Sequence, residues 1–224
     1  KYIKLKDPYR STTSIEGAPD WTRFGFQVAD AGDTNGDGYR DLIVASTSDT
    51  VSVAFGGAAG VARTVGWTVS GPAGELFGIS VSGAGDVDGD GFDDILVGSH
   101  GPGHAYLFRG GAGGPSRSST VLVDPRQTLQ WFGGEVAGVG DVNGDGYDDV
   151  AVGGNNETSY ESHACIYLGA PGGPSTSPTT TLTGRSNTEF AMVLGAAGDV
   201  NGDGFDDVLV AAPGDGTGRV YLYF

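Results

Sequence analysis

The nine residues Asp141-Val-Asn-Gly-Asp-Gly-Tyr-Asp-Asp149 decide how this chain is interpreted, because close variants of them occur four times. The other copies begin at Asp33, Asp86 and Asp199, so that successive copies are 53, 55 and 58 residues apart. A short apolar run follows each copy, as in Val150-Ala-Val-Gly153, and a phenylalanine stands nine residues before each. Self-similarity at a period of this length is typical of solenoids, propellers and other repeat architectures.

Each repeat contains several candidate strands. The apolar runs after the motifs are short, rich in β-branched residues and bounded by glycine, which is typical of buried strands. Four strands in about 55 residues is the size of a propeller blade. We therefore predict an all-β fold, a β-propeller of four four-stranded antiparallel blades in one domain. Third and fourth strands are predicted at 50–55, 104–108, 163–168 and 219–224, and at 67–70, 120–123 and 179–183.

The two ends of the chain suggest how the ring closes. The repeats lie at about 18–72, 73–125, 126–185 and 186–224, and the last one ends at Phe224 after its third strand. The N-terminal segment within 1–17 has strand-like residues at 1–8 and again at 11–17. We expect one of these to pair with the C-terminal strand in a shared blade, because such closure removes an open sheet edge. The alternative is that the chain is a fragment of a larger ring.

The composition restricts the partners. The chain of 224 residues has 12 basic and 28 acidic residues and a formal net charge of −16. This balance argues against nucleic acid or an anionic membrane surface as a partner, and it permits multivalent cations. No apolar run approaches the roughly 20 residues of a membrane span, so no membrane insertion is expected. The single cysteine, Cys165, cannot form an internal disulfide.

The oxygen atoms of the repeated motif follow a metal-ligand pattern. Oxygen-bearing side chains stand at motif positions one, three, five and nine, glycine stands at six, and the residue at seven offers its backbone carbonyl. Alternate positions of a looped chain point toward one centre, as Ca²⁺ requires, and Mg²⁺ fits less well. We predict about four Ca²⁺, one per repeat, held by these residues: Asp33, Asn35, Asp37, Tyr39 and Asp41; Asp86, Asp88, Asp90, Phe92 and Asp94; Asp141, Asn143, Asp145, Tyr147 and Asp149; Asp199, Asn201, Asp203, Phe205 and Asp207.

The motif begins like an EF-hand loop but does not continue as one. An EF-hand needs a glutamate at position twelve on a helix, whereas position twelve is valine in every copy and lies in an apolar run. The same residue argues against a dockerin-like module, and the spacing excludes a nonapeptide β-helix repeat. The motifs could also be Asx-rich turns capped by their own side chains. Four copies with the same oxygen positions favour calcium over that alternative.

The sequence resembles FG-GAP repeats, the units of the integrin α-chain β-propeller and of some fungal and bacterial propeller lectins. The resemblance rests on Phe24-Gly25, Phe77-Gly78 and Phe132-Gly133 together with the four Asp-rich loops, and it covers about 20–224. It implies a structural Ca²⁺ in the hairpin between the first and second strands of each blade, and ligand binding on the opposite face. The family usually closes with seven blades, so a fragment of a seven- or eight-bladed ring is the alternative to four blades.

No catalytic residues are expected. An enzyme needs a nucleophile with a base or a tuned acid pair, and the sequence has no such constellation outside the loops. His163 and Cys165 are two apart on a predicted strand and share a face, but two ligands do not make a zinc site and a buried cysteine is usually part of the packing. We expect Trp67, in an outer strand, to be structural.

Candidate ligand-binding residues lie in the connections opposite the Asp-rich loops. Trp21 and Trp131 fall in fourth-to-first connections, and Asn155 and Tyr160 fall in the longest second-to-third connection. Aromatic rings can stack on sugar faces or anchor a protein partner. We therefore expect an extracellular, secreted or cell-surface binding or adhesion module for a glycan or protein ligand. The alternative is a structural or assembly module within a larger secreted protein or enzyme; the oligomeric state is open.

Overall fold

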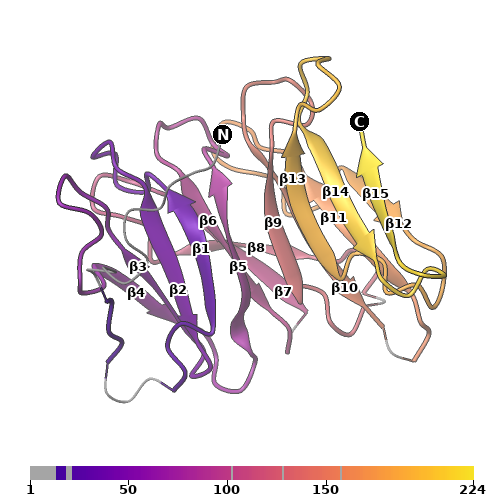
Figure 1. Cartoon of the computed structure of the whole chain (residues 1–224), viewed down its shortest axis with the longest axis horizontal. Coiled ribbons are helices and arrows are strands. Elements are labelled where there is room, and N and C mark those ends of the chain that lie inside the picture. Colours follow the sequence, from indigo (N-terminus) through magenta and orange to yellow (C-terminus); the bar gives the residue numbers. More distant parts are fainter. Residues whose placement is uncertain (1–13, 19–21, 102, 128, 157) are drawn as a thin grey trace.

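Alternating apolar strands and glycine-rich turns give an all-β molecule. The computed structural model describes residues 14–18, 22–101, 103–127, 129–156 and 158–224. These residues form β-strands joined by turns and contain no helix (Figure 1). The first sheet has the order β1-β2-β3-β4 and consists of β1 (Gln27–Gly32), β2 (Asp41–Ser46), β3 (Thr50–Ala54) and β4 (Trp67–Ser70).

The same antiparallel order recurs along the chain. The second sheet consists of β5 (Phe77–Gly85), β6 (Asp94–Ser99), β7 (His104–Phe108) and β8 (Ser119–Val123). The third consists of β9 (Glu135–Gly140), β10 (Asp149–Asn155), β11 (Ser162–Tyr167) and β12 (Thr180–Thr183). The fourth consists of β13 (Val193–Gly198), β14 (Asp207–Ala212) and β15 (Arg219–Tyr223). The predicted all-β, propeller-like fold of four antiparallel blades is thereby confirmed, with three strands described in the last blade.

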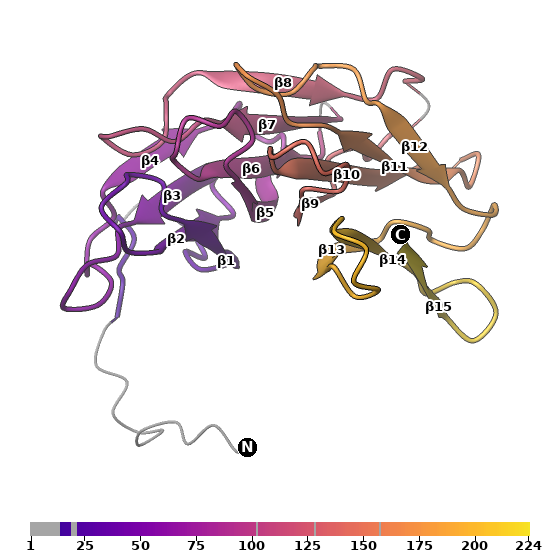
Figure 2. The same cartoon turned by 90° about the horizontal axis from the view of Figure 1, so that it is seen from above.

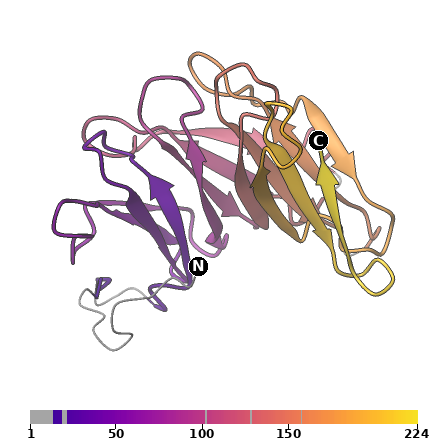
Figure 3. The same cartoon turned by 45° about the horizontal axis from the view of Figure 1, so that its top comes forward.

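The blades follow one another around an open arc. The first strands β1, β5, β9 and β13 lie on its inner side, and β4, β8 and β12 lie on its outer side (Figure 2). The indigo first blade and the yellow fourth blade are the two ends of the arc (Figure 3). Strand β1 packs against β5, β5 against β9, and β9 against β13, but no comparable packing joins β13 to β1 among the described strands.

Closure of the ring stays a prediction. The candidate N-terminal strand at 1–8 lies outside the described residues, and so do residues 11–13 of the candidate at 11–17. Its last residues, 14–17, form no strand.

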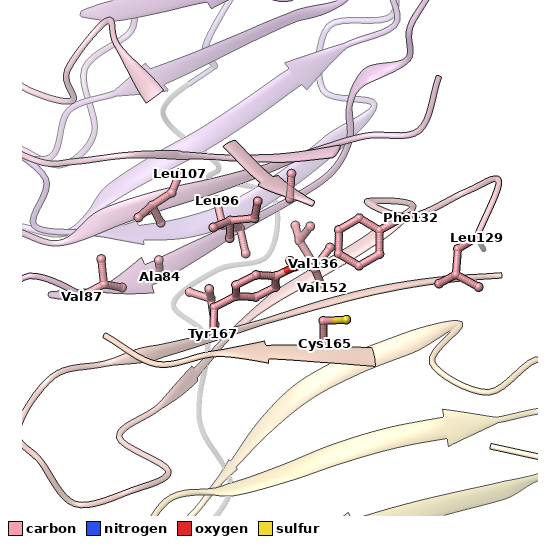
Figure 4. Packing of buried hydrophobic residues seen from close by; sticks show 13 residues of the cluster. Ala84, Val87, Leu96, Leu107, Leu129, Phe132, Val136, Val152, Cys165 and Tyr167 are labelled. Atoms are coloured by element: carbon pink, nitrogen blue, oxygen red, sulfur yellow. The ribbon is translucent and has the colours of Figure 1, made fainter. Parts of the chain in front are cut away.

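The hydrophobic core is divided among the gaps between blades. Ile43 and Val53 of the first blade meet Ile95 and Phe108 of the second. In the next gap, Leu96 and Leu107 meet Phe132 and Tyr167 of the third blade (Figure 4). A third cluster joins Ala151 and Ile166 to Phe190 and Val210 of the fourth blade. Each blade therefore buries its apolar faces against its neighbours, since a single sheet has no interior of its own.

Neighbouring blades also pair at their Asp-rich loops. The backbone N–H of Asp33 donates to the Oδ2 of Asp93 in the next blade (2.6 Å), and the N–H of Asp93 donates to the carbonyl oxygen of Asp33 (3.1 Å). Asp93 stands at motif position eight, for which the sequence predicted no role. The same reciprocal pair joins Asp86 to Asp148 (2.9 and 3.2 Å) and Asp141 to Asp206 (3.1 and 3.0 Å).

Glycine at motif position four makes room for an aromatic ring of the following blade. Gly36 has a φ of +74°, and a Cβ added there would lie 2.6 Å from the ring of Phe92. Gly89 meets Tyr147 and Gly144 meets Phe205 in the same way, at 2.5 and 2.6 Å. Glycine alone tolerates both the left-handed conformation and this close approach. In each of these pairs the ring at position seven therefore packs on the glycine at position four of the loop before it, and the aspartate at position eight accepts the N–H of position one of that loop.

We predict that Asp148→Ala destabilises the protein by about 1–3 kcal/mol, because it leaves the N–H of Asp86 without its acceptor. Urea unfolding in calcium-containing buffer measures this. The matched control is Arg40→Ala at the same motif position in the first blade, where the side chain forms an exposed ion pair with Asp30 and a loss below about 1 kcal/mol is expected. Equal losses for the two variants would contradict the inter-blade role of position eight.

Candidate functional site

The Asp-rich motifs lie in the turns between the first and second strands of all four blades. These turns are β1–β2, β5–β6, β9–β10 and β13–β14, and they lie on one face of the arc (Figure 1). Within the first turn the carboxylate of Asp33 accepts hydrogen bonds from the N–H groups of Gly36 (2.8 Å), Asp37 (3.1 Å) and Gly38 (2.7 Å). Asp86, Asp141 and Asp199 do the same in their own turns.

The aspartates at position nine lie at the buried base of these turns. Asp94 is fully buried, and its carboxylate accepts hydrogen bonds from the N–H of Val87 (3.1 Å) and of Gly110 (2.7 Å). Burial raises the pKa of Asp94 to about 7 and that of Asp149 to about 6. Removing a carboxylate from water disfavours its charged form, so a nearby cation would favour the ionised form of both groups.

The second turn brings three carboxylates together. Oxygen atoms of Asp86, Asp88 and Asp94 all lie within 4.8 Å of one another. Carboxylate oxygens are the ligands that Ca²⁺ prefers, so this donor set suits that ion. The guanidinium of Arg109 lies 3.0 Å from the Oδ2 of Asp88 and supplies a positive charge there. No sequence pattern indicated this contact, because Arg109 follows a different strand.

A cavity of about 450 Å³ opens between the third and fourth blades. Three of the four predicted ligand residues, Trp131, Asn155 and Tyr160, line it. The fourth, Trp21, lies outside the described residues. Trp131 comes from the β8–β9 connection, whereas Asn155 and Tyr160 come from the end of β10 and the β10–β11 connection. These connections lie opposite the Asp-rich turns, because they join the other ends of the strands.

The fourth blade supplies the other wall of the cavity, which no sequence pattern predicted. This wall consists of Asn187, Glu189 and Met192 from the β12–β13 connection. The backbone N–H of Asn187 donates to the carbonyl oxygen of Tyr160 (3.2 Å), and the N–H of Trp131 donates to that of Asn155 (3.1 Å). The first hydrogen bond joins the β12–β13 connection to the β10–β11 connection, and the second joins the β8–β9 connection to the end of β10.

Several cavity residues have an unusual backbone conformation. Tyr160, Asn187 and Glu189 have φ angles of 56°, 62° and 52°, in the left-handed region. A bulky residue such as tyrosine is uncommon there and costs roughly 1–3 kcal/mol, which is typical of binding sites and turns. Tyr160 is also 58% exposed. Tyr160 therefore lies at the rim of the cavity, and its left-handed backbone conformation lowers the stability of the folded protein.

The strand that carries His163 and Cys165 is buried rather than open to the cavity. The Nε2 of His163 lies 3.3 Å from the Oδ1 of Asp124, with both side chains inside the protein. Burial lowers the pKa of His163 and raises the pKa of Cys165 to about 11. The thiol therefore stays protonated at neutral pH, the form in which it is a poor nucleophile. Trp67 packs edge-on against Phe108 at a ring separation of 5.5 Å, in agreement with a structural role.

No helix among the described residues could cross a lipid bilayer.

Comparison with known proteins identifies the repeats. The model of the FG-GAP-like repeat matches residues 33–97 and 86–152, and that of the FG-GAP repeat matches residues 193–223. The solved structure of BBS1N in complex with ARL6DN aligns with 88% of this chain and 50% of that chain, at 18% identity and a TM-score of 0.48.

Integrin alpha chains are among the similar curated proteins. Integrin alpha-PS3 of Drosophila melanogaster is 34% identical in an alignment of 168 positions that covers 67% of this chain and 14% of that protein. Integrin alpha-8 of Mus musculus is 29% identical in an alignment of 242 positions that covers 95% of this chain and 22% of that protein. The chain thus spans less than a quarter of the length of either relative. Because the FG-GAP-like model matches more than half of the sequence, the chain belongs to the FG-GAP repeat family and is similar to integrin alpha chains.

Proposed function

We propose that this protein is a non-enzymatic, calcium-stabilised binding module that holds its ligand in the cavity between the third and fourth blades. The observation that supports this most is the convergence of Trp131, Asn155 and Tyr160 in that cavity. The similarity to integrin alpha chains supports an adhesion role of the same kind. The ligand site and the Asp-rich turns lie at opposite ends of the blades, so calcium has a structural role here and does not contact the ligand.

Each Asp-rich turn would hold one Ca²⁺ through its side-chain oxygens at positions one, three, five and nine and the carbonyl oxygen at position seven. When bound, the ion neutralises carboxylates that would otherwise repel one another. Four ions would change the formal charge from −16 to −8. The buried aspartates at position nine anchor the turn to the blade, so that ion binding and sheet packing support each other.

The location we propose is extracellular. Calcium sites with dissociation constants of about 10⁻⁴–10⁻³ M are those of extracellular modules, where the ion is abundant. Turns that are largely open to solvent and assembled from one short segment suit this range. The similarity to integrin alpha chains supports a location at the cell surface or outside the cell.

The chemistry of the cavity favours a glycan as the ligand. Its lining combines the indole of Trp131 with the amides of Asn155 and Asn187 and the carboxylates of Glu161 and Glu189. Aromatic rings pack against the apolar faces of sugars, and amides and carboxylates bind their hydroxyl groups. A protein ligand that presents a basic side chain is the second candidate, because the two carboxylates and the indole also suit a cation.

We predict that calcium binding weakens as the pH falls. Protons compete with Ca²⁺ for Asp94, so the affinity of the second turn should be roughly tenfold or more lower at pH 5.5 than at pH 7.5. Without calcium, by contrast, we predict that the folded protein becomes more stable as the pH falls. The pKa of Asp94 and Asp149 in the folded protein lies above the value of about 4 in the unfolded chain, so in EDTA their contribution to stability falls as the pH rises from about 4 to about 7.

Isothermal titration with CaCl₂ at the two pH values measures the change in calcium affinity. Thermal melts with and without EDTA measure the change in stability. Chelation should lower the melting temperature at pH 7.5, because a ligand of the folded state alone stabilises it. The calcium proposal would be contradicted if EDTA left the melting temperature unchanged and mass spectrometry detected no calcium bound to the protein.

We predict that Trp131→Ala lowers ligand affinity at least about tenfold, as truncation of a central aromatic residue commonly does. The test is a glycan array probed with labelled protein in millimolar calcium, followed by titration of the sugar found. Phe26→Ala, which removes an exposed aromatic outside this cavity, is the control and should bind normally. A blank array with folded, calcium-loaded protein would exclude the glycan and turn the search to protein ligands. Equal binding by both variants would exclude this cavity.

A further inference from the structure

Three side chains of types that bind transition metals meet between the second and third blades. Asp124 directly follows β8, and His163 and Cys165 are two residues apart on one face of β11. An oxygen, a nitrogen and the sulfur of these side chains all lie within 4.8 Å of one another, and the three residues are buried. Sequence spacing indicated His163 and Cys165 alone, since Asp124 belongs to the preceding blade. The structure thus adds a third ligand, the number that an open zinc site takes from the protein.

His163 has a buried ring nitrogen without a hydrogen bond. Its side chain is 1% exposed, and its Nε2 atom has no hydrogen-bond partner among the described residues. That atom lies 3.3 Å from the Oδ1 of Asp124. Zn–N and Zn–O bonds of about 2.0–2.1 Å in tetrahedral geometry place two ligand atoms about 3.3–3.4 Å apart. The pair is therefore spaced for one shared ion, which would satisfy a nitrogen that is otherwise costly to bury.

Asp124 stands at a repeat position that is glycine in the blades on either side. The residue directly after the fourth strand, at the same register, is Gly71 in the first blade and Gly184 in the third. The Asp124 carboxylate is buried and accepts hydrogen bonds from the N–H groups of Arg126 (3.0 Å) and Leu129 (3.4 Å). These bonds fix an anionic group at a position where the two neighbouring blades carry no side chain.

The second blade supplies an internal comparison. His104 occupies the strand position of His163, but Tyr106 occupies that of Cys165. In the fourth blade an arginine and a tyrosine stand at these two positions. Among the described blade interfaces, the complete ligand set is therefore found between the second and third blades alone.

A cavity of about 240 Å³ leads to this site. His163 forms part of its wall, together with Glu161 and Ser186, which are exposed at its rim. The charged lining residues Arg126 and Glu161 have opposite signs, so neither sign dominates the approach. The cavity gives a metal ion a route from solvent and leaves room for a water molecule as a fourth ligand.

We propose that Asp124, His163 and Cys165 bind one zinc-type divalent ion, with water as the fourth ligand, and thereby fasten the third blade to the second. A donor set of one oxygen, one nitrogen and one sulfur suits Zn²⁺ or Co²⁺, whereas Ca²⁺ takes oxygen ligands. On binding, the thiol of Cys165 releases its proton to solvent, and the imidazole binds through Nε2 and keeps its proton on Nδ1. The carboxylate and the thiolate then neutralise the two positive charges of the ion, as a buried site requires.

This site is distinct from the Asp-rich turns and from the ligand cavity, so it goes beyond the proposed binding function. Asp124 begins the β8–β9 connection, and Trp131 lies later in the same connection. The ion would therefore hold in place a segment that contributes to the ligand cavity.

The test uses the full chain in millimolar calcium, so that Ca²⁺ competes for the Asp-rich turns, and Co²⁺ is the probe. A cobalt–thiolate charge-transfer band in the near ultraviolet reports on this site alone, because Cys165 is the only cysteine of the chain. We expect the band to saturate at one Co²⁺ per chain. Excess Zn²⁺ should abolish it, since both ions take the same tetrahedral ligands.

Asp124→Asn and His163→Gln each remove one ligand and keep the thiol. Both should lower Co²⁺ affinity at least about tenfold, because loss of a mere supporting contact of a metal ligand already costs that much. The matched control, His104→Gln, changes the histidine at the same strand position of the second blade and should bind Co²⁺ normally. Circular dichroism checks the folding of each variant. Equal affinity of the three variants would overturn the proposal.

Two measurements decide the question even if the Asp124 and His163 variants do not fold. Folded wild-type protein that shows no charge-transfer band in excess Co²⁺ would refute the site. Zn²⁺ should also raise the melting temperature of the wild-type protein in calcium buffer more than that of Cys165→Ala, because an ion bound by the folded state stabilises it. An equal increase in both proteins would place the bound zinc elsewhere and would likewise overturn the proposal.

Discussion

A four-stranded sheet that is apolar on both faces cannot bury either face by itself, and the rest of this structure depends on that constraint. The fold solves it by stacking: residues such as Leu96 and Leu107 of the second blade are buried only because Phe132 and Tyr167 of the third blade cover them. The core is therefore a series of inter-blade clusters rather than one centre. In such a repeat array, stability comes from the interfaces between neighbours as much as from the units themselves.

The Asp-rich loops serve this stacking as well as the proposed ion. The proposed ion would bind the oxygens at positions one, three, five and nine, whereas positions seven and eight contact the preceding blade. Asp149 and Asp148 show the division, since adjacent carboxylates bond to different blades. Ion binding that fixes the loop would also fix the contact surface for the neighbour. The proposed calcium binding would thus be coupled to blade packing through residues that are adjacent in the chain.

The proposed ligand cavity depends on the same stacking at the other end of the blades. Trp131 and Asn155 belong to the third blade, but Asn187 and Glu189 come from the connection into the fourth. The cavity exists only while these two blades are packed together. Tyr160, Asn187 and Glu189, which line this cavity, have left-handed backbone conformations.

The sequence by itself determined the repeat, the strands and the residue types of the loops, because these depend on local patterns of apolar, glycine and aspartate residues. It also predicted Trp131, Asn155 and Tyr160 as ligand residues from their place in the repeat, and the structure brings these three together at one cavity. Only the tertiary structure decided which groups meet across blades: Asp148 with Asp86, Arg109 with Asp88, and Asn187 with Tyr160. These partners are 21 to 62 residues apart. Their contact is fixed by the stacking of whole sheets, which no local pattern encodes.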